Sequence, residues 1–268
     1  MKAFDYVVAG VRVAERSLVQ RPRLGHEERL VFVVGCPRSG TTFMGRAIGG
    51  LPGFVDLSEV TPWKAALPHG PSAQELRSIL ERVRLIGLAR GLRGVEQTPE
   101  TSHVLAEALE AYPQAQAVHA LRDGRDVVCS LLERGWLNAG NAGGDDAGLA
   151  YGAEPRFWVE PERREEFTQV SDAQRCAWAW RRYVEAVRSA GAGKRLLEIR
   201  YENFSTSAET LAEFLGANVT SAHRSLDDFR DTSIGRWQRE LTPDQLADVE
   251  AEAGALLTEL GYTRSSPA

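Results

Sequence analysis

The feature that most constrains the fold is an apolar run over residues 30–34 that ends at Gly35. Its residues, Leu-Val-Phe-Val-Val, are typical of a strand that is buried on both faces of a parallel sheet. The next segment, Gly-Cys-Pro-Arg-Ser-Gly-Thr-Thr over residues 35–42, opens a predicted helix that runs from Thr41 through Ile48. A strand, a glycine-bounded turn and a helix in this order indicate an α/β fold.

Further apolar segments alternate with helical stretches along the chain. The predicted strands are 54–57, 94–96, 117–121 and 195–199, and the predicted helices are 73–91, 101–111, 125–134 and 172–190. Strands that alternate with helices form βαβ units, in which the strands are parallel. We therefore expect a P-loop-like, three-layer α/β fold with a central, mostly parallel sheet flanked by helices.

The length of the chain fits one domain of this type. Its 268 residues are 43% hydrophobic, and we predict a single domain over residues 1–268. Residues 1–29 form its leading segment, with an amphipathic helix over 1–20. Residues 135–170 break the pattern with glycines and acidic residues, so an irregular binding region is expected there. A final helix is predicted from an N-cap at Thr242 to about Leu260.

Charge and cysteine usage exclude several classes of protein. The formal net charge of −5 argues against a protein that coats nucleic acid. Three widely spaced cysteines, at positions 36, 129 and 176, suggest neither a disulfide framework nor a zinc site. Charged residues interrupt the first apolar segment, and no apolar run reaches membrane-spanning length. We expect a soluble, cytoplasmic protein.

The turn over residues 35–42 has the composition of a phosphate-binding loop. Glycines at both ends let the backbone curl tightly, and the following helix start presents free N–H groups and a partial positive charge to an anion. The glycine spacing matches the Walker A loop, but Thr41 stands where that loop carries its lysine. A kinase or ATPase is therefore disfavoured. A glycine-rich turn without a ligand is the plain alternative.

Residues 37–42 resemble the 5'-phosphosulfate loop of the sulfotransferases that use 3'-phosphoadenosine-5'-phosphosulfate (PAPS) and release PAP. The resemblance implies that PAPS is the donor and that its phosphosulfate group is held by Pro37, Arg38, Ser39, Gly40, Thr41 and Thr42.

A second match to the same family covers residues 121–130. In the family, an arginine and a serine eight positions later bind the 3'-phosphate, and Arg122 and Ser130 keep that spacing. A plain helix start capped by Asp123 is the alternative for this segment.

Two shorter segments also resemble the family. Arg200-Tyr201-Glu202 is similar to a segment that packs near the nucleotide, although Tyr201 is equally compatible with an ordinary core aromatic residue. Gly235-Arg236-Trp237 resembles a C-terminal segment whose basic residue reaches the 3'-phosphate side of the donor. The alternative for Arg236 is a surface arginine stacked on Trp237.

Sulfuryl transfer, like phosphoryl transfer, needs a base that takes the proton of the acceptor. Glu59 follows the second predicted strand and is similar in position to the base of tyrosylprotein sulfotransferases. We predict that Glu59 is the base and that Arg38 stabilises charge on the sulfuryl group. The alternative for Glu59 is a solvated loop carboxylate. His119 is expected to be packed inside a strand, and His69 is a loop alternative.

At one position this sequence differs from the family. Related sequences often carry a lysine in a Glu-Lys-Thr-Pro stretch, where it can stabilise the bridging oxygen. This chain has Glu96-Gln97-Thr98-Pro99 instead, and Gln97 brings no charge. Either another cation such as Arg38 supplies the stabilisation, or turnover is slow.

The sequence thus predicts metal-free transfer of a sulfuryl group from PAPS to a hydroxyl group on a small molecule or a peptide. The residues around 135–170 are expected on the acceptor side of the site. A kinase-like phosphotransferase and a non-catalytic PAP- or PAPS-binding protein are the two alternatives.

Overall fold

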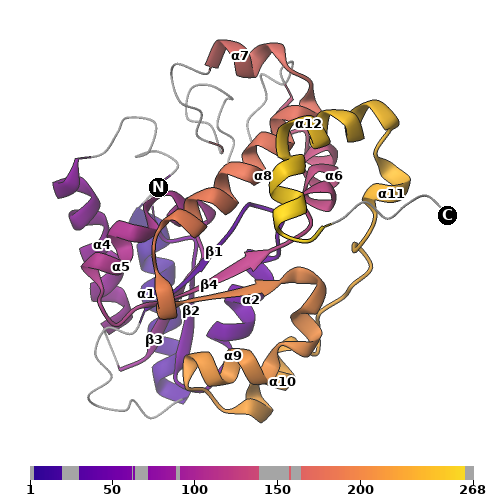
Figure 1. Ribbon diagram of the computed structural model, residues 1–268. Helices are drawn as coiled ribbons and strands as arrows, with labels where there is room; N and C mark the ends of the chain where they lie inside the picture. Colours follow the sequence, from indigo (N-terminus) through magenta and orange to yellow (C-terminus); the bar gives the residue numbers. More distant parts are fainter. Residues whose placement is uncertain are drawn as a thin grey trace.

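A five-stranded parallel sheet forms the centre of the computed structural model, which describes residues 3–19, 30–61, 63, 72–88, 91–138, 157 and 164–262 (Figure 1). The strands are β1 (Val31–Val34), β2 (Phe54–Ser58), β3 (Arg93–Glu96), β4 (Gln116–Leu121) and β5 (Leu196–Arg200). Their order is β2-β3-β1-β4-β5, and each pairing within this sheet is parallel. The predicted fold class is confirmed.

Helices cover both faces of the sheet (Figure 1). They are α1 (Ala3–Val19), α2 (Thr41–Gly49), α4 (Ala73–Leu88), α5 (Leu105–Ala111), α6 (Gly124–Arg134), α7 (Arg164–Gln169), α8 (Asp172–Ser189), α9 (Ala208–Leu215), α10 (Val219–Leu226), α11 (Trp237–Glu240) and α12 (Pro243–Glu259). Short 3-10 helices, η2 (Pro99–Val104), η4 (Gly193–Arg195) and η5 (Tyr201–Thr206), complete the described elements. Among these residues, no helix is both long enough and apolar enough to cross a bilayer.

Strand β1 shows why the sheet has helices on both faces. Val31 and Val33 belong to an apolar cluster shared with α2, α9 and α10. Phe32 and Val34, which point to the opposite face, belong to a cluster shared with α1, α4 and α5. Because all four side chains are completely buried, β1 is stable only between two helical layers.

The leading helix α1 packs beside β2, the strand at one edge of the sheet. Ala9 and Val13 are buried on its inner side. Arg12 Nη1 donates to the Asp56 carboxylate at 3.1 Å, and Arg16 Nε donates to the carbonyl of Phe54 at 3.2 Å. These contacts fix the predicted amphipathic helix on the domain and help to cover a sheet edge.

The C-terminal helix α12 begins as predicted. Thr242 is its N-cap, and the Thr242 hydroxyl and the Gln245 side chain form a reciprocal capping box. The region 135–170, predicted to be irregular, contains helix α7 within its described part. That helix has six residues, with two glutamates in its first turn, and a helix this short leaves almost no apolar periodicity. The segments of α9 and α10 had likewise not been assigned as helices.

The contact between α2 and β2 provides a test of the packing. A Cβ atom placed at Gly49 would lie 2.5 Å from the backbone nitrogen of Asp56. Gly49→Ala should therefore force α2 away from the sheet and lower the free energy of unfolding by about 1–3 kcal/mol. Urea denaturation measures the change.

Gly10→Ala in α1 is the matched control, because a Cβ atom there meets nothing within 4 Å. It should leave stability unchanged or raise it by up to about 1 kcal/mol. Equal stabilities for Gly49→Ala and the wild type would contradict the packing described.

Candidate active site

The residues singled out in the sequence gather at the carboxyl end of the sheet. Residues 35–42 follow β1, Glu59 follows β2, Gln97 follows β3, Arg122 follows β4 and Tyr201 follows β5. Parallel strands place these positions along one edge, where open α/β sheets bind their ligands. The two segments that are expected to bind phosphate, residues 35–42 (the first motif) and 121–130 (the second motif), stand at the ends of β1 and β4, which are hydrogen-bonded neighbours.

The loop after β1 curls as its glycines require. Gly35 N–H donates to Ser102 Oγ at 3.0 Å, and Ser39 N–H donates to the Cys36 carbonyl at 3.0 Å. Gly40, the N-cap of α2, has φ 92°, and a Cβ atom there would lie 2.7 Å from the Tyr201 ring. Among the described residues, no side chain caps α2, so its first N–H groups can receive an anion.

The second motif contacts the first directly. Arg38 Nε donates to Ser130 Oγ at 2.9 Å, and Arg122 Nη1 donates to the Arg38 carbonyl at 3.0 Å. The Arg122 guanidinium lies 4.4 Å from the centre of the Tyr201 ring. Its Nε is buried and has no hydrogen-bond partner in the described part of the chain. The structure thus unites Arg38, Arg122, Ser130 and Tyr201 in one place.

The C-terminal turn packs against the start of α6 and completes this group. Arg122 Nη2 donates to the Ser233 carbonyl at 2.6 Å. The Asp126 carboxylate accepts the N–H groups of Gly235 at 2.8 Å and of Trp237 at 3.0 Å. Burial raises the pKa of Asp126 above its ordinary value, although these two hydrogen bonds oppose the shift. The turn is therefore anchored beside Arg122.

Arg236 lies in this turn but pairs with acidic side chains. Its guanidinium donates to Glu240 at 2.7 Å and to Glu133 at 3.0 Å. The arginine that lies over the Trp237 ring, at 3.9 Å, is Arg125. The alternative for Arg236, a stack on Trp237, is thus wrong, because Arg125 lies over that ring. The phosphate role of Arg236 stays a prediction.

Glu59 and Gln97 follow the two neighbouring strands β2 and β3. Glu59 is half-buried, next to Ser58, which has φ 63°. Gln97 is 2% exposed, and its amide donates to Asp56 at 3.4 Å. A Cβ atom at Gly45 of α2 would lie 2.7 Å from the Gln97 side chain. Gln97 therefore packs against α2, and it supplies no charge to the site.

The aromatic rings that surround Tyr201 next to the loop were not predicted from the sequence. The Phe43 and Phe229 rings are 5.4 Å apart, and Phe229 lies 4.8 Å from the Tyr201 ring. Phe204 packs among the three. The only available signal was that Phe43 directly follows Thr42. Three partly exposed rings, Phe43, Tyr201 and Phe229, thus lie beside the loop over residues 35–42 and form a surface on which a flat ring can stack.

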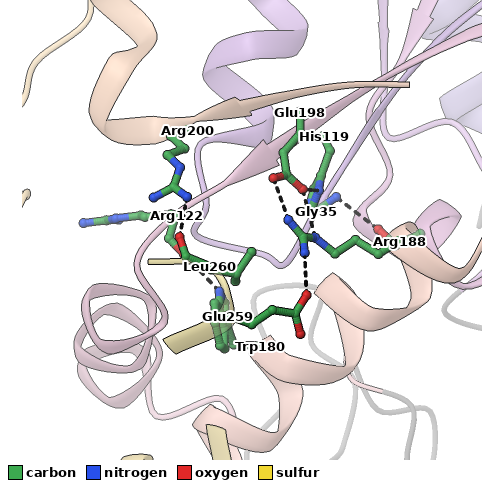
Figure 2. Close-up of polar contacts among 10 residues, drawn as sticks. Gly35, His119, Arg122, Trp180, Arg188, Glu198, Arg200, Glu259 and Leu260 are labelled. Atoms are coloured by element: carbon green, nitrogen blue, oxygen red, sulfur yellow. Dashed lines mark hydrogen bonds and ion pairs between the residues drawn. The ribbon is translucent and has the colours of Figure 1, made fainter. Parts of the chain in front are cut away.

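His119 is a buried residue of β4, as predicted (Figure 2). Its Nδ1 lies 3.1 Å from Glu198 of β5, and Arg188 bridges Glu198 and Glu259 at 2.9 Å each (Figure 2). Burial opposes ionisation of Glu198, but hydrogen bonds from His119 and Arg188 outweigh it and lower its pKa to about 2. This network joins the sheet to α8 and α12. His69 lies outside the described residues.

Comparison with known proteins assigns the family. The model described as "Sulfotransferase domain" matches residues 30–224, which include the loop, Glu59, Arg122, Ser130 and Tyr201. The chain therefore belongs to the sulfotransferase family. Curated protein sequences give no match.

Solved sulfotransferases share the fold at low sequence identity. The sulfotransferase domain of the Synechococcus PCC 7002 olefin synthase is 15% identical, with a TM-score of 0.55 over 87% of this chain and 98% of that one. The sulfotransferase domain of the curacin biosynthetic pathway is 12% identical, with a TM-score of 0.57 over 88% and 98%. Mouse sulfotransferase SULT7A1, solved with PAP, is 14% identical, with a TM-score of 0.50 over 94% and 91%.

The low pKa of Glu198 makes a prediction about acid stability. The pKa of Glu198 is about 2 in the folded protein, below its ordinary value of 4.5. The contacts of Glu198 with His119 and Arg188 therefore contribute stability above pH 4.5 that is lost as pH falls toward 2. We expect Glu198→Gln to cost about 1–2 kcal/mol at pH 6, since solvent screens a partly exposed pair, and less than half of that at pH 3. Urea denaturation across this range measures the loss.

Glu209→Gln is the control, because the Glu209–His223 pair is solvent-exposed. It should change stability very little at either pH. A pH-independent effect of Glu198→Gln would refute the ionic origin of its contribution.

Proposed function

We propose that this sulfotransferase moves a sulfuryl group from PAPS to a hydroxyl group of a small-molecule or peptide acceptor. The observation that carries the proposal is the direct contact between the two phosphate motifs, in which Arg38 bonds Ser130 and Arg122 bonds the Arg38 carbonyl. A single group of residues can therefore hold both anionic ends of one donor, its 5'-phosphosulfate and its 3'-phosphate. The cytoplasmic location and the single-domain organisation stay predictions.

The described residues fit such a donor. The uncapped start of α2, with Pro37, Arg38, Ser39, Gly40, Thr41 and Thr42, suits the phosphosulfate group. Arg122, whose Nε is buried without a partner, and Ser130 suit the 3'-phosphate. The partly exposed rings of Phe43, Tyr201 and Phe229 suit the adenine base. The PAP complex of the mouse sulfotransferase supports this choice of donor.

PAPS supplies an activated sulfate, and the chain supplies positioning and charge. Arg38 and the N–H groups of α2 stabilise the negative charge on the sulfuryl oxygens during in-line transfer. Glu59 takes the proton of the acceptor hydroxyl group. Because Gln97 is neutral and packed against α2, Arg38 is the cation assigned to the bridging oxygen.

The neutral Gln97 also favours a second candidate, a PAP- or PAPS-binding protein without turnover. A kinase-like phosphotransferase is disfavoured, because Thr41 replaces the lysine that would reach the β- and γ-phosphates of ATP.

The proposal is tested by following PAP release from PAPS with a panel of phenols, sugars and tyrosine peptides. The wild-type protein should transfer the sulfuryl group to at least one acceptor class. Glu59→Gln should lower kcat by about a hundredfold or more while the Kd for PAP changes by less than about threefold, because the base acts only in the chemical step.

Glu15→Gln on α1 is the control and should keep wild-type kcat. PAP binding without transfer to any acceptor would favour the non-catalytic candidate, and a fully active Glu59→Gln variant would remove Glu59 from the mechanism.

A further inference from the structure

A buried carboxylate at the end of β3 organises the loop that carries Glu59. Glu96 has no exposed surface. Its Oε1 accepts the Thr98 N–H at 2.9 Å, the Thr61 hydroxyl at 3.2 Å and the Thr98 hydroxyl, and its Oε2 accepts the Thr101 hydroxyl at 2.9 Å. Each of these four hydrogen bonds comes from an uncharged donor. A carboxylate buried this deeply persists only where such donors compensate it.

The neighbouring contacts fix the direction of these hydrogen bonds. Trp63 Nε1–H donates to Thr101 Oγ1 at 3.0 Å, and Thr61 N–H approaches Thr98 Oγ1 at 3.4 Å. Because an ionised carboxylate can only accept, the Thr98 and Thr101 hydroxyls each accept one of these N–H groups and donate their own proton to Glu96. Two chains of hydrogen bonds thus run from the loop after β2 into one carboxylate.

Glu59 lies between two anchors of this kind. On one side of it, the Ser58 carbonyl accepts the Gln97 N–H at 3.2 Å. On the other side, Thr61 binds Glu96. Both partners belong to the end of β3, and only Val60 separates Glu59 from Thr61. The residues on both sides of Glu59 are therefore held to the same strand end, Ser58 through its backbone and Thr61 through its side chain.

The segment after β3 also supports the phosphosulfate loop. Ser102 of η2 accepts the Gly35 N–H at 3.0 Å. From these contacts we infer that Glu96 is a positioning residue, which sets Glu59 at a fixed place relative to the loop over residues 35–42. The inference rests on the proposed function of Glu59 as the base.

Protonation should weaken this arrangement near neutral pH. Burial raises the pKa of Glu96 to about 7, against the opposing effect of the threonine hydrogen bonds. A proton on Glu96 needs an acceptor, and a Thr98 or Thr101 hydroxyl that accepts it can no longer donate to Glu96. The Thr61 hydroxyl can turn to accept it, but all the hydrogen bonds to Glu96 are then bonds to a neutral group and hold the loop more weakly.

Glu96→Gln tests the inference, because an amide cannot accept at both positions. We expect kcat for sulfuryl transfer to fall by about tenfold or more, while the Kd for PAP changes by less than about threefold. The acidic limb of the kcat profile near pH 7 should move or vanish. Glu107→Gln, on the exposed face of α5, is the matched control and should keep the wild-type values.

Trp63 gives a readout that does not depend on turnover. The fluorescence of Trp63 is obtained as the difference between the wild type and Trp63→Phe, and it should change with pH around pH 7. The same difference between Glu96→Gln and the double variant Glu96→Gln/Trp63→Phe should not change with pH. Thr101→Val is a milder variant, because it removes only the hydrogen bonds that lead from Trp63 through Thr101 to Glu96. It replaces Glu96→Gln if that variant does not fold. It should also lower kcat and alter the Trp63 fluorescence.

These outcomes separate the two proposals. A wild-type protein that transfers no sulfuryl group would refute the proposed function, whatever Trp63 reports. Wild-type kcat and pH profile in Glu96→Gln and Thr101→Val would overturn the positioning role and leave PAPS-dependent transfer standing.

Discussion

The site depends on the contacts that the Arg122 guanidinium makes. It donates to the carbonyls of Arg38 and Ser233 and lies over the Tyr201 ring. Through these contacts, one side chain at the end of β4 holds together the loop after β1, the segment after β5 and the C-terminal turn. A planar guanidinium with several donors in a fixed geometry can do this, whereas a lysine cannot. The carbonyl of Arg122 itself accepts the Trp180 indole N–H at 3.1 Å (Figure 2).

This arrangement explains how an acidic chain can hold an anion. The net charge of −5 gives no general attraction for phosphate. The positive groups of the site are local: Arg38, Arg122 and the uncapped start of α2. Carboxylates nearby serve structural tasks, because Asp126 binds the N–H groups of the C-terminal turn and Glu133 pairs with Arg236.

The parts of the fold set by local sequence could be predicted. The run ending at Gly35, the helix from Thr41 and the N-cap at Thr242 each carry their signal within a few residues, and the structure confirms them. That the segments of Arg38 and Ser130 lie close together followed from two motifs placed at the ends of strands in one parallel sheet, but the direct hydrogen bond between them did not. Contacts between distant segments had no such signal, which is why the stack of Arg125 on Trp237 and the threonines around Glu96 were not foreseen.

A crystal structure of the protein with PAP bound tests the central claim most directly. We expect the 5'-phosphate to lie against the N–H groups at the start of α2 and the 3'-phosphate to lie within hydrogen-bond distance of Arg122 and Ser130. PAP bound elsewhere, or with its 3'-phosphate remote from both residues, would contradict it.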